Sequence, residues 1–213
     1  MNRGKRTLDI FLAVVGLLLL WPLFLLIAAL IKAEDGGPVF FCQTRVGLGG
    51  TPFNIWKFRT MVPNAERLGP ALTSSGDPRI TRVGARLRKA KLDELPQLFN
   101  VLMGEMSLVG PRPEVSKYVR MYTSEQRAVL DLMPGVTDKA SIVFADEGLR
   151  LAGAEEPECH YVERIMPEKI RLNLEYARDA TVLNDLRVIL ATIGHLVPRP
   201  KRDNLRRQRR GRD

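Results

Sequence analysis

The stretch KLDELPQL at residues 91–98, followed by SLVGPRPE at residues 107–114, carries the strongest signal in this chain. It places two adjacent carboxylates, Asp93 and Glu94, directly before a run of apolar residues. Leucine and phenylalanine recur there at helical spacing as far as Gly104, where a helix is expected to end. The segment therefore predicts a helix whose first turn presents two acidic side chains.

The two carboxylates are expected to do different jobs, because adjacent helical residues point about 100° apart. One could attack phosphorus or hold a divalent cation such as Mg²⁺, while the other adjusts the local charge or carries a proton. Alternatively, Asp93 caps the helix, Glu94 favours its positive end and Pro96 occupies its first turn. The local pattern favours the cap. A nucleophile at a helix start would satisfy the same geometry, so both interpretations stay open.

Basic residues flank this segment and recur upstream of it. Guanidinium groups are permanently charged and can donate two hydrogen bonds to one phosphate. We expect five basic side chains to offset phosphate charge: Lys57, Arg59, Arg79, Arg88 and Arg112. The alternative is that the arginines form a solvated basic face.

An uncharged apolar run of 22 residues extends from Ile10 to Ile31. As a straight helix it would be roughly 33 Å long, enough to cross a bilayer. Pro22 lies at its middle and is expected to bend it. Basic residues stand on both sides, so charge gives no strong preference for sending one end across. From these residues, a kinked spanning helix and a helix that returns to the same face are both open.

The remaining pattern predicts a mostly helical α+β fold with one small β-hairpin. The hairpin strands are expected at 39–43 and 53–59, and the expected helices cover residues 81–89, 116–132 and 163–177. Within the second helix, Ser124 or Thr123 could cap the residues from Glu125 onward. Residues 183–197 carry one apolar stripe, which suits an amphipathic helix at a membrane interface or one packed on the core. The predicted organisation is a membrane segment (1–33), a cytosolic catalytic domain (34–200) and a basic tail (201–213).

The charge of the chain points to an anionic partner. The tail holds seven basic and two acidic residues, so it carries +5 of the net charge of +9. Such a tail attracts anionic lipid or nucleic acid. Beside a membrane segment, membrane lipid is the favoured partner, and no nucleic-acid motif is present. The two cysteines, Cys42 and Cys159, lack metal-ligand spacing and are expected to be reduced thiols.

Several motifs together closely resemble the bacterial sugar transferase family, the small monotopic phosphoglycosyl transferases. Besides the two segments quoted first, they are PVFFCQTRVG (38–47), KFRTM (57–61) and DPRITRVG (77–84). The resemblance runs from about residue 5 to residue 135 and returns more weakly over 176–197.

The resemblance implies an enzyme that transfers a sugar-1-phosphate from a nucleotide diphosphate sugar, usually a UDP-sugar, to polyprenyl (undecaprenyl) phosphate. It implies that Asp93 attacks the sugar-linked phosphate, that a covalent phosphosugar intermediate forms, and that UMP leaves. Mg²⁺ is implied near Asp93, and Glu94 corresponds to the family's glutamate. A re-entrant membrane helix hairpin, broken at Pro22, would place the enzyme on the cytosolic face of the bacterial inner membrane.

Other points stay open at this stage. After Pro134 the chain continues with DKASIVFADE at 138–147, where many family members carry a different stretch that includes an arginine; nucleotide or sugar contacts there are in question. A rival reading is a non-catalytic membrane scaffold that recruits glycosyltransferases. The sugar and the oligomeric state are not defined, with a homodimer as one candidate.

Overall fold

The fold is mostly helical with one small antiparallel hairpin, which confirms the α+β prediction. The computed structural model describes residues 3–69, 73 and 76–196. The predicted basic tail, 201–213, lies outside the described residues.

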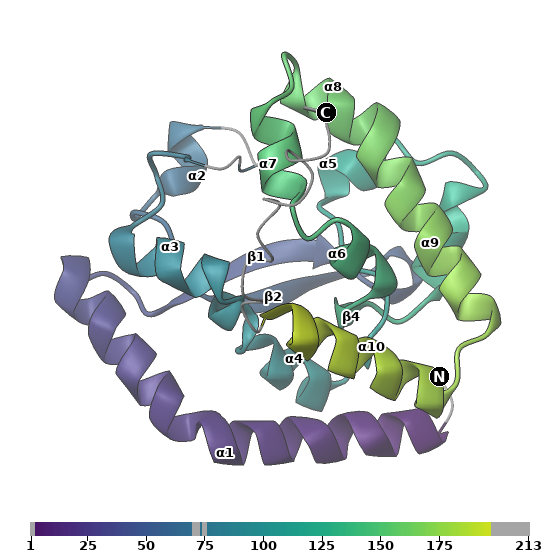
Figure 1. Ribbon diagram of the computed structural model, residues 1–213, viewed down its shortest axis with the longest axis horizontal. Helices are drawn as coiled ribbons and strands as arrows, with labels where there is room; N and C mark the ends of the chain where they lie inside the picture. Colours follow the sequence, from purple (N-terminus) through teal and green to yellow (C-terminus); the bar gives the residue numbers. More distant parts are fainter. Residues whose placement is uncertain (1–2, 70–72, 74–75, 197–213) are drawn as a thin grey trace, which may run out of the picture.

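A single long helix, α1 (Arg3–Asp35), forms one side of the molecule. Its 33 residues correspond to about 50 Å of helix. It continues through Pro22, so two helices separated by a break are not seen. Figure 1 shows α1 bent in its middle, with the other elements lying on one side of it. The helix is long and apolar enough to cross a membrane.

The outer face of α1 is uncovered and strongly apolar. Large side chains exposed along it include Phe11, Leu18, Leu19, Trp21, Leu25 and Leu26. Leu19 alone leaves 74% of its surface exposed. A continuous exposed apolar surface of this kind marks a contact with lipid or with another protein.

Polar contacts fix the first turns of α1 to the rest of the chain. The Lys5 ammonium donates to the carbonyl of Val109 (2.8 Å) and pairs with Asp185 (2.7 Å). The buried Asp9 carboxylate accepts hydrogen bonds from the Ser107 hydroxyl (2.8 Å) and the Leu108 N–H (3.1 Å). The N-terminal end of α1 therefore docks on residues 107–109, which follow the acidic motif KLDELPQL (91–98).

The other end of α1 is fixed in a similar way. The Glu34 carboxylate accepts from the N–H groups of Arg82 (2.7 Å) and Val83 (3.2 Å), at the start of a helix. Asp35 forms a two-point ion pair with Arg59. Both ends of α1 thus contact one and the same body of protein.

The elements that carry the acidic motif follow α1. Strands β1 (Phe40–Val46) and β2 (Pro52–Phe58) form the antiparallel hairpin, with Phe40 opposite Phe58 and Val46 opposite Pro52. Next come α2 (Ala65–Leu68), α3 (Arg82–Lys89), the 3₁₀ turn η2 (Leu92–Glu94) and α4 (Gln97–Met103). As predicted, Gly104 ends α4, in a left-handed conformation with φ of 87°.

A short parallel pair of strands and a helical lobe complete the chain. Strand β3 (Ser107–Val109) pairs with β4 (Gly135–Thr137), a pairing that the sequence analysis missed. The lobe consists of α5 (Ser116–Val119), η3 (Gln126–Asp131), α6 (Lys139–Val143), α7 (Glu147–Ala152), α8 (Pro157–His160), the π-helical turn Tyr161–Ile165 and α9 (Met166–Arg178). The last helix, α10 (Val182–Leu196), packs near β3, β4 and α6.

The prediction of one helix over 116–132 was wrong. The chain instead forms α5, leaves the helical path, and restarts as η3. Thr123 and Gln126 cause the restart, because the Thr123 hydroxyl accepts from the Gln126 N–H (3.2 Å) while the Gln126 amide accepts from the Thr123 N–H (3.0 Å). The cap at Thr123 was one of the two that the sequence analysis offered, but it begins a new 3₁₀ segment and does not lie within one continuous helix.

Helix α1 is part of the core and not an appendage. Ala13 packs in one buried cluster with Ile55, Val101 and Met106. Farther along, Ile27 and Ile31 pack in a second cluster with Phe58 and Leu87. A third cluster lies within the α5–α9 lobe. The hairpin, α3 and α4 are therefore held against the same helix that presents the apolar outer face.

Candidate active site

The acidic motif sits on a sharp turn between α3 and α4. Lys91, the first residue of the motif, has φ of 56°, a left-handed conformation that non-glycine residues rarely adopt. This turn redirects the chain into η2 and leaves Asp93 only 6% exposed. No side chain caps η2 or α4, so the capping role considered for Asp93 was wrong.

Glu94 is held by two basic side chains from different parts of the chain. Arg112 grips it with both guanidinium nitrogens, and its Nη1 lies 2.9 Å from Oε2. Lys57, from β2, places its ammonium 3.7 Å from Oε1. These ion pairs thus tie η2, just before α4, to the hairpin and to the connector after β3 (residues 110–113).

The environments of the two carboxylates push their pKa values apart. Burial, and then the neighbouring charge of Glu94, raise the pKa of Asp93, although Lys57, Arg88 and Arg112 oppose the shift. Burial would also raise the pKa of Glu94, but Arg112 and Lys57 outweigh it and hold that pKa well below its usual range. Glu94 is therefore a fixed negative charge, and Asp93 is the more basic carboxylate.

The basic side chains near Asp93 are themselves perturbed. Burial, with help from the Arg112 charge, lowers the pKa of Lys57 to about 8, although Glu94 opposes the shift. Arg88 lies near enough to Asp93 to stabilise its charged form. One guanidinium nitrogen of Arg88, Nη1, is buried without a hydrogen-bond partner in the described chain.

The other two residues expected to bind phosphate, Arg59 and Arg79, form ion pairs of their own. Arg59 donates to Asp35 and to the carbonyl of Pro38 (2.6 Å). Arg79 donates to Asp77 (2.6 Å) and to the carbonyl of Ala65 (3.1 Å). Lys57, Arg88 and Arg112 thus meet at the acidic pair. A phosphate-binding role for Arg59 and Arg79 stays a prediction.

The connector that carries Arg112 is held by a close crossing of two backbones. A Cβ added to Gly110 would lie 2.2 Å from the Met133 carbonyl, and one added to Gly135 would lie 2.1 Å from the Gly110 nitrogen. Only glycine fits at such a crossing. It brings the start of β4 against the residues just before Arg112.

Asp138 fixes the backbone of Arg112 itself. This carboxylate is almost fully buried and accepts from the Arg112 N–H (3.1 Å) and the Asn173 amide (2.9 Å). It also caps α6 through the Ser141 N–H. Asp138 belongs to the stretch left open in the sequence analysis, and its long-range role could not be read from local spacing.

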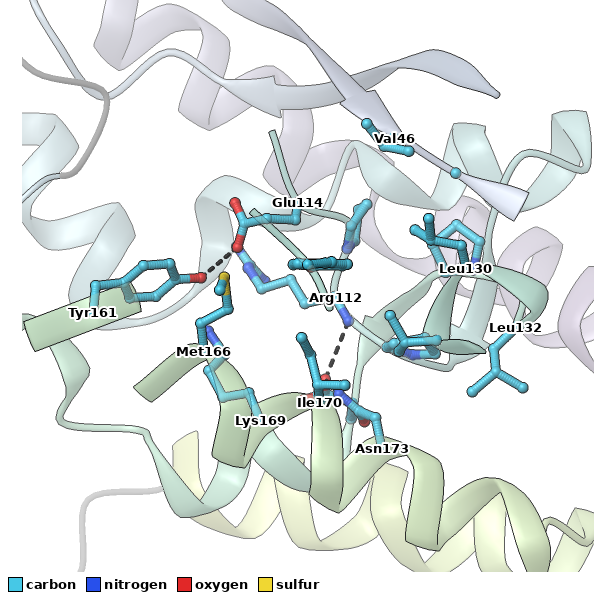
Figure 2. Close-up of a pocket in the computed structure, with 17 residues that line it drawn as sticks. Val46, Arg112, Glu114, Leu130, Leu132, Tyr161, Met166, Lys169, Ile170 and Asn173 are labelled. Atoms are coloured by element: carbon cyan, nitrogen blue, oxygen red, sulfur yellow. Dashed lines mark hydrogen bonds between the residues drawn. The ribbon is translucent and has the colours of Figure 1, made fainter. Parts of the chain in front are cut away.

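A pocket lined by both apolar and polar side chains lies behind the connector, with a free volume of about 40 Å³. Figure 2 shows Tyr161 pointing at Glu114 from one side, while Lys169 and Asn173 approach from α9. The volume suits one or a few water molecules and not a nucleotide. The side chains that line the pocket therefore hold the connector in place.

The sequence analysis also missed Gln97, which follows Asp93 by four residues. Its side chain is 0% exposed, and neither amide atom has a hydrogen-bond partner within the described residues. Its position inside the KLDELPQL motif was visible, but its complete burial was not.

The donor set fits a hard cation that is held mainly by its substrate. Asp93 Oδ1 is buried and has no hydrogen-bond partner in the described chain. Over the ranges that the structure describes, no group of three or more His, Cys, Asp or Glu residues could hold a metal ion alone. Mg²⁺ is commonly bound by one or two carboxylates together with substrate phosphates, so a site centred on Asp93 is compatible with it.

The site therefore combines a buried, basic carboxylate with three cations, on a body that carries an exposed apolar helix. These features suit a site that handles phosphate groups beside an exposed apolar surface. The chain matches the family model described as bacterial sugar transferase over residues 1–199, and it belongs to that family, which makes it a transferase.

Curated relatives agree with this assignment. The chain is 41% identical over 196 residues to the UDP-glucose:undecaprenyl-phosphate glucose-1-phosphate transferase of Caulobacter vibrioides, covering 91% of this chain and 69% of the relative. It is 46% identical over 142 residues to the UDP-N-acetylgalactosamine-undecaprenyl-phosphate N-acetylgalactosaminephosphotransferase of Aeromonas hydrophila (65% and 34%). A glucose-1-phosphate transferase for undecaprenyl phosphate from Escherichia coli is 37% identical over 192 residues (89% and 39%). The chain thus spans little more than a third of the last two relatives.

The Glu94–Arg112 pair gives a stability prediction. Arg112→Met should destabilise the protein by about 1–3 kcal/mol, because the mostly buried Glu94 loses its bidentate partner. Adding Glu94→Gln should restore part of that loss, because the unpaired charge is removed. Thermal unfolding of the full chain in one detergent measures both changes.

Arg171→Met is the matched control, because Arg171 forms exposed ion pairs and should contribute little. A double variant no more stable than Arg112→Met alone would show that an unpaired charge on Glu94 is not the cause of the lost stability.

Proposed function

We propose that this protein transfers a sugar-1-phosphate from a UDP-sugar to undecaprenyl phosphate and releases UMP. The observation that carries the proposal is Asp93: a buried carboxylate with one unpartnered oxygen, facing the cations of Lys57, Arg88 and Arg112. The names of the relatives support the donor and the acceptor. A non-catalytic scaffold would have no need for a strained turn and three cations around one buried carboxylate.

The reaction would proceed in two displacements at one phosphorus atom. An Asp93 oxygen attacks the sugar-linked phosphorus, an O–P bond forms, and the bond from that phosphorus to UMP breaks. An oxygen of the lipid phosphate then attacks the same phosphorus, and the bond to Asp93 breaks. The products are UMP and the undecaprenyl-diphosphate sugar, and the Asp93 carboxylate is restored.

The surrounding side chains make this chemistry feasible between anions. The raised pKa of Asp93 makes it a stronger nucleophile than an exposed aspartate. Lys57, Arg88 and Arg112 offset the charge of two anionic substrates and of the developing transition state. Glu94 stays ionised and keeps Arg112 and Lys57 in place. Mg²⁺, held by Asp93 and substrate phosphate, would neutralise further phosphate charge.

The membrane arrangement follows from the two ends of α1. Lys5 and Asp9 at one end, and Glu34 and Asp35 at the other, contact the same body. A helix fixed at both ends to one domain would have to enter the bilayer from one face and stay on that face. We therefore propose a re-entrant helix, bent near Pro22, at the cytosolic face of the bacterial inner membrane. The active site would then lie at the depth of lipid headgroups.

The covalent intermediate is tested by mass spectrometry of the intact protein. With a panel of UDP-sugars and Mg²⁺ but no acceptor, the wild-type chain should gain the mass of one phosphosugar. Asp93→Asn should gain none and release no UMP when acceptor is added, because an amide is a poor nucleophile.

Asp131→Asn makes the same chemical change at an exposed position and should react like the wild type. An adduct on Asp93→Asn, or UMP release from it at the wild-type rate, would remove Asp93 as the nucleophile.

The pKa of Lys57 predicts an alkaline limit to activity. Below pH about 8 the ammonium is protonated and positive, and it loses that charge as the pH rises through this value. The ratio kcat/KM for UMP release should therefore fall above pH 8. In Lys57→Arg the fall should move to higher pH, because a guanidinium stays charged. An identical alkaline limb in the two proteins would assign it to another group.

The topology is tested by labelling single cysteines in a chain that lacks Cys42 and Cys159. Arg3→Cys and Ala33→Cys lie at the two ends of α1 and are exposed. A membrane-impermeant maleimide should label both in inside-out vesicles and neither in spheroplasts. Ser124→Cys, in the proposed cytosolic body, is the control. Labelling of either end of α1 from outside would indicate a spanning helix.

A further inference from the structure

Gln97 is an unusual buried residue because its carboxamide is left without a partner. It is the first residue of α4, it is 0% exposed, and neither Oε1 nor Nε2 has a hydrogen-bond partner within the described chain. A glutamine amide has two N–H donors and an acceptor oxygen, and buried groups of this kind are nearly always satisfied. An exception calls for an explanation, such as a ligand or ordered water.

The unpartnered atoms are not scattered. Five buried side-chain atoms in the described residues lack a partner, and four of them belong to Arg88, Asp93 and Gln97. The fifth, Oδ1 of Asn173, belongs to the water-sized pocket in Figure 2. Three residues within ten positions of one another thus carry nearly all of the unused buried hydrogen-bonding capacity.

Gln97 follows Asp93 by four residues, across the junction between η2 and α4. The buried positions of α4, which are Gln97, Asn100 and Val101, follow the spacing of one helical face, and both η2 with its buried Asp93 and α4 pack against β2. Lys57, also on β2, reaches the Glu94 carboxylate. Gln97 therefore lies between the acidic pair and the part of α4 that is bonded to the hairpin.

Asn100, about one turn further along, shows how this face treats a structural amide. Its oxygen accepts from the Trp56 N–H (3.0 Å), and its nitrogen donates to the Asn54 carbonyl (2.8 Å) and to Glu105 (2.7 Å). The amide of Asn100 joins α4 to β2, whereas the neighbouring amide of Gln97 joins nothing. The contrast points to a ligand for Gln97.

We propose that the Gln97 carboxamide binds the sugar-linked phosphate of the donor, beside Asp93. Its Nε2 and the free Nη1 of Arg88 supply N–H groups for phosphate oxygens, and its Oε1 remains available for a bound water. The inference rests on the proposed function and adds a polar contact to the transferred phosphate. Gln97 binds and orients this group and does not react with it.

The test compares the affinities of UDP and UMP, because UDP carries the phosphate in question and UMP lacks it. Isothermal titration of the full chain in detergent, with Mg²⁺ present, gives both dissociation constants. In the wild type UDP should bind more tightly than UMP. Gln97→Met keeps the volume of the side chain but removes its polar atoms. It should weaken UDP binding about tenfold, as expected for a hydrogen bond to a charged group, and leave UMP binding unchanged.

Two further variants separate binding from structure. Gln97→Glu keeps the shape and adds a charge that repels phosphate, so it should weaken UDP binding further. Gln126→Met makes the same exchange as Gln97→Met in η3, far from Asp93 in the sequence, and should bind UDP like the wild type. The ligand-free Tm of Gln97→Met should equal or exceed that of the wild type, because no partner is lost.

Each result bears on one claim. Unchanged UDP binding in Gln97→Met, an equal loss for UDP and UMP, or unfolding of both Gln97 variants would overturn the role of Gln97. Equal wild-type affinities for UDP and UMP would overturn it as well. A wild-type chain that binds neither nucleotide and forms no phosphosugar adduct would instead contradict the proposed function.

Discussion

The ion pair between Glu94 and Arg112 is the interaction on which the rest of the site depends. It joins three separate segments of the chain: η2 just before α4, the connector after β3, and, through Lys57, the hairpin. Without this pair, Glu94 would be a buried charge next to a second carboxylate, and the repulsion would favour protonation of one of them. Arg112 and Lys57 keep Glu94 ionised, and burial together with the Glu94 charge raises the pKa of Asp93. The arrangement thus assigns different roles to two adjacent acids.

In the proposed arrangement the long helix α1 would set the position of this charged cluster relative to the membrane surface. Its inner face contributes Ala13 to one buried cluster and Ile27 and Ile31 to another, and these clusters also contain residues of β2, α3 and α4. Any depth that α1 takes in a bilayer is therefore transmitted to the acidic motif without a flexible link. Arg59 and Asp35 contribute to this positioning, because they fix the end of α1 to the end of the hairpin.

Local signals in the sequence were enough to predict the elements that carry the site. Apolar spacing and Gly104 defined α4, glycine and proline turns defined the hairpin, and the adjacent acids Asp93 and Glu94 marked the site. The sequence analysis did not predict features that depend on contacts between residues far apart in the chain. Strands β3 and β4 are three residues each, so neither has a recognisable pattern, and their pairing depends on the Gly110–Gly135 crossing. The sequence offered Thr123 as a cap, but it did not show that the chain leaves the helical path between α5 and η3.

Residue type alone also does not indicate which polar side chains are available to bind a ligand. Arg59 and Arg88 look equivalent in the sequence, yet one is bonded to Asp35 and the other keeps a buried nitrogen free. Asn100 and Gln97 differ in the same way on one helical face. A folded chain normally satisfies its buried polar groups, so those it leaves unsatisfied indicate where a substrate completes the structure. In the proposed reaction the substrate phosphate would lie among Arg88, Asp93 and Gln97. Nucleophile, charge and hydrogen-bond donors would then reach it from residues within ten positions of one another in the sequence.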